Sequence, residues 1–351
     1  MGYRRYGLPV LIEGENDGHA EDSLEESKSM RDDRGFLGAL IGDGRPLLLF
    51  MALGLVLSGG FALFLSATGH FLPHDVQFLG MTSEQLCAIN ECRIVHFMFH
   101  DRVSFGGVLI AVGTLYLWLA EFPLRHRQGW AWWVFLASGV LGFGSFLAYL
   151  GYGYLDTWHG IATLGLLPFF VLGLVRMFFL LRPPVTAACL LRSPMKVSWA
   201  SSFGLGRACL LATAVGLIAG GATILIVGMT CVFVPQDLAY MGLNAQDLHA
   251  INPRLVPLIA HDRAGFGGGV CTYGAVMFFC VWCGNPSRSL WQALAIAGFA
   301  AFATAIGVHP LVGYTDPVHL APAVIGAALF IAGLVLTFKP MVGEVKMPGS
   351  H

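Results

Sequence analysis

The stretch HDRVSFGGVLIAVGTLYLWLAE (residues 100–121) joins a charged triplet to a long apolar run that ends in one acid. A helix that crosses a bilayer needs about 20 predominantly apolar residues, and 103–121 comes close to that length. The rest of the chain has the same character, because 56% of its 351 residues are apolar and only 12% are charged. Soluble domains carry roughly 25% charged residues. A soluble globular enzyme, a collagen-like fibre and a disordered protein are therefore excluded, and a polytopic membrane protein remains.

Apolar stretches of spanning length occur eight times, which predicts an all-α protein with eight transmembrane helices. They are 46–70, 103–121, 131–151, 159–181, 208–233, 265–283, 291–309 and 319–338. Two of them, 103–121 and 265–283, are short, so we expect their helices to extend backwards into the preceding polar residues. Residues 1–45 lack the apolar core of a secretory signal and predict a polar, disordered tail.

The loops on the two sides of the predicted membrane differ in charge. The side that holds both termini carries Arg125, Arg127, Arg176, Arg182, Arg192, Lys196, Arg207, Arg288, Lys339 and Lys346. The opposite side carries mostly acids, namely Asp75, Glu84, Glu91, Asp101, Asp156, Asp237, Asp247, Asp262 and Asp316. The positive-inside rule then predicts an integral, multi-pass protein with both termini in the cytoplasm. The acidic side would face the periplasm or the exterior.

Three polar blocks of the first half recur in the second half. FLPHDVQFLGMTSEQLCAIN (71–90) matches FVPQDLAYMGLNAQDLHAIN (233–252), HDRVSFGG (100–107) matches HDRAGFGG (261–268), and GYLDTWH (153–159) matches GYTDPVH (313–319). The offsets are 162, 161 and 160 residues, so the blocks recur in order. We therefore expect two tandem four-helix repeats, 46–181 and 208–338, related by a pseudo-twofold axis along the membrane normal. A basic linker (182–207) joins them, and a cytoplasmic tail (339–351) follows.

Some of the repeated residues have a structural interpretation. Thr82 and Asn244 each stand three residues before a side chain that completes a capping box, which predicts two short interfacial helices. Asp316 precedes a proline, which is a favourable helix start, and Asp156 holds the same place in the first half.

The polar residues that both halves retain all fall on the predicted outer side. The pairs are Asp75/Asp237, Asn90/Asn252, His100/His261, Asp101/Asp262, Arg102/Arg263, Tyr154/Tyr314, Asp156/Asp316 and His159/His319. An ionisable triplet at the edge of a span is costly unless it is paired. In one interpretation the Asp-Arg pairs of the two HDR triplets exchange partners between the halves as an ion-paired lock. That interpretation leaves the repeated histidines unexplained.

The four repeated histidines suggest a cofactor. Each repeat would present two imidazoles at similar depth, which fits bis-histidine haem ligation by His100 with His159 and by His261 with His319. Arg102 and Arg263 would then orient the ligands or contact the propionates of the haem.

Two glycines, Gly107 and Gly268, lie seven residues after a histidine, which is nearly two helical turns. They leave room either for a flat macrocycle or for close helix contact.

In span count, duplication and sidedness, residues 46–338 resemble haem A synthase. That family consists of eight-span membrane proteins built from two tandem four-helix bundles, with paired histidines on the second, fourth, sixth and eighth spans. The resemblance implies that His100, His159, His261 and His319 occupy the corresponding helices. The family often carries a cysteine pair in its first outer loop, where this chain has Cys87 and Cys92. A helix through both cysteines would point the sulfurs apart, so a bridge between them requires local unwinding.

Several functions remain open. The first is a haem-binding membrane oxidoreductase that exchanges electrons with a quinone or a membrane redox partner. The second is a solute or proton transporter with its path between the repeats. The third is a divalent metal site at the outer face, drawn from His100, Asp101, Asp156, His159, His261, Asp262, Asp316 and His319. A structural membrane subunit is the fourth. No nucleic-acid motif occurs.

Overall fold

The computed structural model describes residues 35–147, 154, 157–181 and 186–343. The chain divides into two compact units, Met1–Gly42 and Asp43–His351. In the first unit the described part contains one helix, α2 (Phe36–Ile41). This helix lies inside the segment 1–45 for which the sequence predicts a disordered tail. The second unit holds every other helix of the described residues and is described by itself below.

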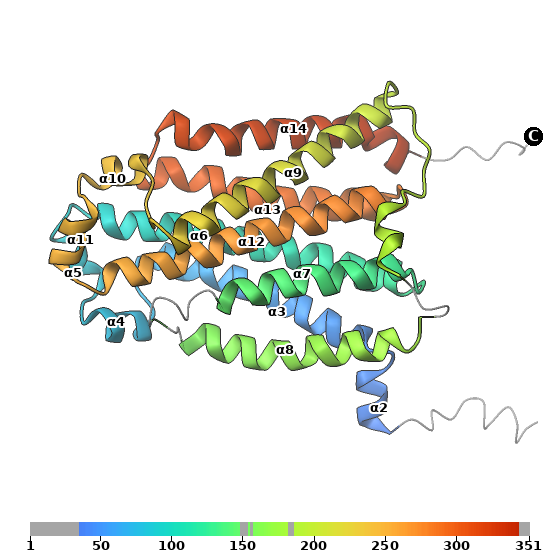
Figure 1. The fold of residues 1–351 in the computed structure, drawn as a ribbon, viewed down its shortest axis with the longest axis horizontal. Helices are drawn as coiled ribbons and strands as arrows, with labels where there is room; N and C mark the ends of the chain where they lie inside the picture. The colour runs from blue at the N-terminus through green and yellow to red at the C-terminus, as the bar shows by residue number, and fades with distance from the viewer. Residues whose placement is uncertain (1–34, 148–153, 155–156, 182–185, 344–351) are drawn as a thin grey trace, which may run out of the picture. The chain divides into compact units, whose positions relative to one another are not determined.

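The second unit is built from long helices that lie side by side (Figure 1). They are α3 (Arg45–Thr68), α6 (Arg93–Leu119), α7 (Gly129–Leu147), α8 (Thr157–Phe178), α9 (Ser202–Met229), α12 (Leu255–Cys283), α13 (Arg288–Val312) and α14 (Pro317–Val342). A π-helical turn, η1 (Ala120–Leu124), extends α6, and a 3₁₀ turn, η3 (Ala187–Leu191), precedes α9. The described residues form no β-strand.

Seven helices in the described part of the chain are long and apolar enough to cross a bilayer, and the protein is therefore a multi-pass integral membrane protein. These seven are all the long helices except α7. The predicted span 131–151 overlaps α7, and its last residues, from 148 on, lie outside the described residues. The predicted linker 182–207 is partly helical, because α9 already begins at Ser202.

Helices α6 and α12 form the centre of the bundle. In their most apolar windows 67% and 72% of residues are buried, against 17–28% in the other candidate spans. Both helices begin in the polar residues before the apolar run, at Arg93 and Leu255, as the sequence predicts for its two short spans. His100 and His261 therefore lie about two turns inside these helices, deeper than the helix starts at which the sequence places them.

Glycines allow the central helices to approach their neighbours closely. A Cβ atom on Gly107 would collide with Thr304 of α13, and one on Gly268 would collide with Ser145 of α7. Of the two roles left open for Gly107 and Gly268, the structure therefore shows close helix contact.

Four short helices gather at one end of the bundle, here called the short-helix end (Figure 1). They are α4 (Pro73–Leu79), α5 (Ser83–Cys87), α10 (Pro235–Met241) and α11 (Ala245–Ile251). The capping boxes predicted at Thr82 and Asn244 are both present. Leu86 of α5 and Leu248 of α11 are fully buried in an apolar cluster. The short helices are thus packed onto the bundle rather than loosely attached to it.

Candidate metal centre

Two arginines, Arg102 partly buried and Arg263 buried, organise the polar residues near the short-helix end. Arg102 donates from Nη1 to Asp75 (2.7 Å) and from Nε to Asp262 (2.8 Å). Arg263 donates from Nη1 to Asp237 and forms an ion pair with Asp101, whose Oδ2 lies 3.3 Å from Nε. Each arginine thus bridges one aspartate of its own half and one of the other half. This confirms the predicted exchange of ion-pair partners between the two HDR triplets.

Tyrosines complete these ion pairs. Tyr154 donates its hydroxyl to Asp75 (2.6 Å), and Tyr314 donates to Asp237 (2.8 Å). The contacts therefore form two networks whose residues correspond at offsets of 160–162 positions. The first network is Asp75, Arg102, Tyr154, His261 and Asp262. The second network is His100, Asp101, Asp237, Arg263 and Tyr314.

Both networks are almost completely enclosed by protein. Asp75, Asp101 and Asp237 expose 1% or less of their surface. A buried charge is tolerated only when it is paired and hydrogen-bonded, and removal of one partner is strongly destabilising. Each network holds two carboxylates and one guanidinium, so each carries a net negative charge.

The aspartates also orient the neighbouring histidines. The Nδ1 atom of His100 lies 3.0 Å from Asp101 Oδ1, and that of His261 lies 3.2 Å from Asp262 Oδ1. A carboxylate only accepts hydrogen bonds, so each imidazole carries a proton on Nδ1, and Nε2 is the atom left to act as a ligand when the ring is neutral. That is the arrangement in which proteins prepare a histidine to bind a metal.

The second network continues into a cluster of three histidines. His100 of α6, His309 of α13 and His319 of α14 each offer one ring nitrogen, and these atoms all lie within 4.8 Å of one another. His100 Nε2 lies 3.1 Å from His309 Nε2. His100 and His309 are buried, and His319 is partly buried. We call these three residues the histidine cluster.

Tyr314 sets the protonation of His319. Its hydroxyl donates to Asp237, so its oxygen accepts from Nδ1 of His319 at 3.2 Å. Burial raises the pKa of Tyr314, and the charge of Asp237 raises it further, so the phenol keeps its proton. The Nε2 lone pair of His319 is then available to a metal ion.

His309 lacks such an arrangement. Its Nδ1 atom is buried and makes no hydrogen bond of normal geometry with the described residues, although the ring interacts with the backbone carbonyl of Ala305 one turn earlier. Two Nε2 atoms at 3.1 Å share one proton at most, so His309 donates to His100 and leaves its own Nδ1 lone pair unsatisfied. An unsatisfied buried polar atom is rare and calls for an explanation. A cation bound to the three Nε2 atoms would remove the contact and move the proton of His309 to Nδ1.

His309 is not among the residues that the sequence predicts for the site, because this histidine has no counterpart in the first half. One signal could have identified it. His309 and His319 flank the short turn between two successive spans, since α13 ends at Val312 and α14 begins at Pro317. Antiparallel neighbours joined by a short turn bring such residues together.

The other predicted site residues are placed as follows. His319 lies with His100 rather than with His261, and the ring of His261 lies 5.0 Å from that of Tyr154. Asp316 caps α14 by accepting from the backbone N–H of His319 (2.7 Å), as its structural interpretation predicts. Asp156 lies outside the described residues. His159 belongs to α8, but its side chain is outside the described part of the structure.

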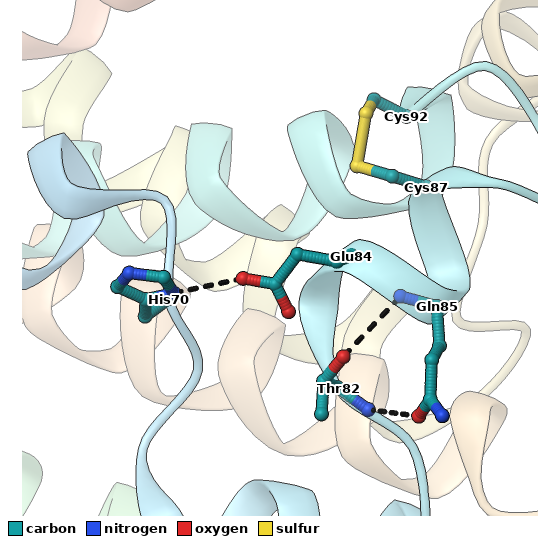
Figure 2. Close-up of a disulfide and its surroundings, with 6 residues drawn as sticks. All are labelled: His70, Thr82, Glu84, Gln85, Cys87 and Cys92. Carbon is teal, nitrogen blue, oxygen red and sulfur yellow. Dashed lines mark hydrogen bonds and ion pairs between the residues drawn. A yellow bond between two sulfur atoms is a disulfide. The ribbon is translucent and has the colours of Figure 1, made fainter.

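The two cysteines of the first predicted outer loop form a disulfide (Figure 2). Helix α5 ends at Cys87, and the backbone of Glu91 and Cys92 adopts left-handed conformations with φ of 46° and 63°. The helix is thus unwound before Cys92, which is the condition that the sequence sets for a bridge. Glu84 of the same helix pairs with His70 (3.0 Å).

Compared with protein-family models, with curated proteins and with solved structures, the chain matches none. The candidate site therefore rests on its own geometry.

Proposed function

We propose that the protein is a membrane metalloprotein in which the histidine cluster binds one divalent transition-metal ion. The observation that carries this proposal is the convergence of three imidazoles from three different helices. Imidazole suits Zn²⁺, Cu²⁺, Ni²⁺ and iron, and three histidines leave a coordination position open for water or a substrate.

The surroundings of the cluster favour a cation. The second network carries a net negative charge, with Asp101 and Asp237 paired to Arg263 alone. Two of the three ligands already donate their Nδ1 protons, to Asp101 directly and to Asp237 through Tyr314. Such outer hydrogen bonds fix the ring and raise the basicity of a ligand histidine. When bound, the ion would act as a Lewis acid at its open position.

We further propose that the chain has eight spans in two tandem four-helix repeats, related by a pseudo-twofold axis along the membrane normal. Paired contacts support this. Gly59 of α3 approaches Gly106 of α6, and Gly221 of α9 approaches Gly267 of α12. Asn90 donates to Met241 O, and Asn252 donates to Leu79 O, again at matching offsets.

The charge pattern of the loops supports cytoplasmic termini. The short-helix end then faces the periplasm or the exterior, and the disulfide between Cys87 and Cys92 at this end agrees with an oxidising compartment. The histidine cluster lies next to this end, so a metal ion could reach it from that side.

Metal binding is tested by loading the purified protein with Co²⁺. Cobalt on a histidine site gives visible absorption bands, and elemental analysis of the same sample gives the stoichiometry. We expect one ion per chain and loss of the bands in His309→Ala. His249→Ala is the matched control, because His249 is an exposed histidine of α11. Equal binding by both variants, or no binding by the native protein, would contradict the proposal.

Haem remains a separate hypothesis for the repeated histidines. At the cluster, the 3.1 Å contact of His100 with His309 and the close packing at Gly107 favour a single ion over a macrocycle. A visible spectrum of the protein expressed with ample haem decides this point. A Soret band that disappears in His100→Ala would support haem in place of the ion.

A further inference from the structure

A cavity of about 500 Å³ lies between α3, α6, α8 and α12, on the side of the first network. This volume is within the usual range for small-molecule sites, roughly 300–1,000 Å³. Most of its lining is apolar. The titratable side chains Arg102, His261 and Asp262 contribute to one part of the wall, and Ser58, Ser66 and Thr163 add hydroxyl groups. Leu109 of α6 lines it as well. Because Phe99 and Leu109 are ten positions apart, the cavity extends about 15 Å along that helix.

The cavity opens towards the bilayer between α3 and α8. These two helices contact each other at the far end from the short helices, where Gly44 meets Gly173 and Phe50 meets Phe169. Beyond that contact they enclose the cavity. Leu57 and Phe61 of α3 line it and are also 73% and 52% exposed, so they form its rim. A ligand can therefore arrive from the lipid phase.

The polar part of the wall selects an uncharged headgroup with hydrogen-bond acceptors. Arg102 uses Nε and Nη1 for Asp262 and Asp75, and its Nη2 atom has no partner among the described residues. Nη2 therefore has N–H groups to donate. Asp262 in the wall and Asp75 behind it both pair with the single guanidinium, so this polar group is net negative. An anionic headgroup such as a phosphate is repelled, whereas a carbonyl oxygen is accepted.

Aromatic side chains stand on both sides of that donor. Phe99 and Phe105 lie three residues before and after Arg102 on α6, and both line the cavity. Positions three apart share one face of a helix. A flat ring can stack against these phenyl groups while its carbonyl accepts from Arg102.

From this arrangement we propose that the cavity binds one molecule of a prenylquinone. The quinone ring lies against Phe99 and Phe105, and a carbonyl oxygen accepts from Nη2 of Arg102. The isoprenoid tail leaves between α3 and α8 past Leu57 and Phe61. The site is separate from the histidine cluster and does not depend on the proposed metal.

The proposal is tested with protein reconstituted in nanodiscs. Decylubiquinone is titrated by calorimetry, and organic extracts of the purified protein are analysed by mass spectrometry for bound quinone. Ala162→Phe places a phenyl group in the cavity wall, and we expect it to lower the affinity about tenfold or more. Leu164→Phe is the control, because Leu164 is on the same helix but 76% exposed and outside the lining.

A second variant distinguishes the contribution of the quinone ring to the affinity from that of the alkyl tail. Arg102→Lys keeps the charge but has a different donor geometry, so we expect weaker binding of decylubiquinone and unchanged binding of decanol, which lacks the ring. Equal affinity of Ala162→Phe and Leu164→Phe would overturn the proposal. Decanol that competes for the cavity as strongly as the quinone would also overturn it, because the ring would then contribute nothing to binding. Two further results would do the same: organic extracts that contain phospholipid but no quinone, or a Soret band that is lost in Ala162→Phe, which would place haem in the cavity. Loss of metal binding in His309→Ala leaves the quinone result unaffected, so the two proposals fail separately.

Discussion

The two buried networks use the same residue types at matching positions, yet they face different surroundings. In the second network, His100 meets His309 and His319, and Nδ1 of His309 makes no hydrogen bond of normal geometry with the described residues. In the first network, His261 faces Tyr154 and lines an apolar cavity. The repeated residues thus provide a common frame of ion pairs. The residues that are not repeated determine which binding site lies next to each network.

The largest expected effect is on stability and follows from removing the arginine of either ion-pair network. Arg263→Ala leaves Asp101 and Asp237 buried without their cation, which costs about 3–5 kcal/mol. Arg102→Ala should cost less, because the side chain of Arg102 is more exposed than that of Arg263 and borders the cavity. Thermal unfolding in detergent compares the two variants.

Arg263→Lys serves as the control for this comparison, because it retains the charge but not the planar guanidinium that lies between Asp237 and Asp101. We expect a midpoint between those of the native protein and Arg263→Ala. If Arg102→Ala proves as destabilising as Arg263→Ala, the two arginines contribute equally to the free energy of unfolding. The cavity beside the first network then does not reduce the cost of losing Arg102.

The next largest effect is on Co²⁺ affinity, which should depend on a histidine of the second network but not on one of the first. His309→Ala removes a proposed metal ligand, and we expect Co²⁺ affinity to fall by more than the 10- to 100-fold that is typical when only a hydrogen-bond partner of a ligand is lost. His261→Ala should leave Co²⁺ binding intact, since His261 belongs to the first network. Cobalt absorption titrations measure both. A loss of cobalt binding in His261→Ala would show that the ion lies elsewhere.

Part of this arrangement can be predicted from the sequence. The partner exchange of Asp101 and Asp262, the caps at Thr82 and Asn244, and the backward extension of α6 and α12 all follow from local pattern and charge. Each of these depends on residues close in sequence or on the need to neutralise a buried charge.

The composition of the histidine cluster could not be predicted in the same way. Helix packing determines which helices face each other. The sequence indicates this packing only through the positions of its glycines. His319 therefore appears as a partner for His261, the histidine of its own repeat, although it lies beside His100 of the other half. His309 carries no repeat signal and lies in an apolar helix, where a single histidine is usually a packing residue.

A smaller effect tests the tyrosines as a matched pair. Tyr314→Phe removes the hydroxyl that links His319 to Asp237, and we expect Co²⁺ affinity to fall about tenfold. Tyr154→Phe removes the corresponding hydroxyl from the first network and should leave cobalt binding unchanged. Both substitutions delete a tyrosine hydroxyl oxygen. Comparing the unfolding midpoints of the two variants shows whether a difference in cobalt affinity merely reflects a difference in stability. Similar losses of affinity in both would contradict the assignment of the metal to the second network alone.

The smallest effect distinguishes a helix cap from a metal ligand at Asp316. The structure shows this aspartate accepting from the backbone N–H of His319 at the start of α14, whereas the sequence also predicts it as a ligand. Asp316→Ala removes the cap and should cost about 1 kcal/mol of stability. Asparagine caps helices as well as aspartate does but lacks the carboxylate charge. If Asp316 acts only as a cap, Asp316→Asn therefore retains both the unfolding midpoint and the Co²⁺ affinity. If Asp316 coordinates the ion, Asp316→Asn keeps the midpoint but binds cobalt as weakly as Asp316→Ala, and the coordination sphere extends beyond the three imidazoles.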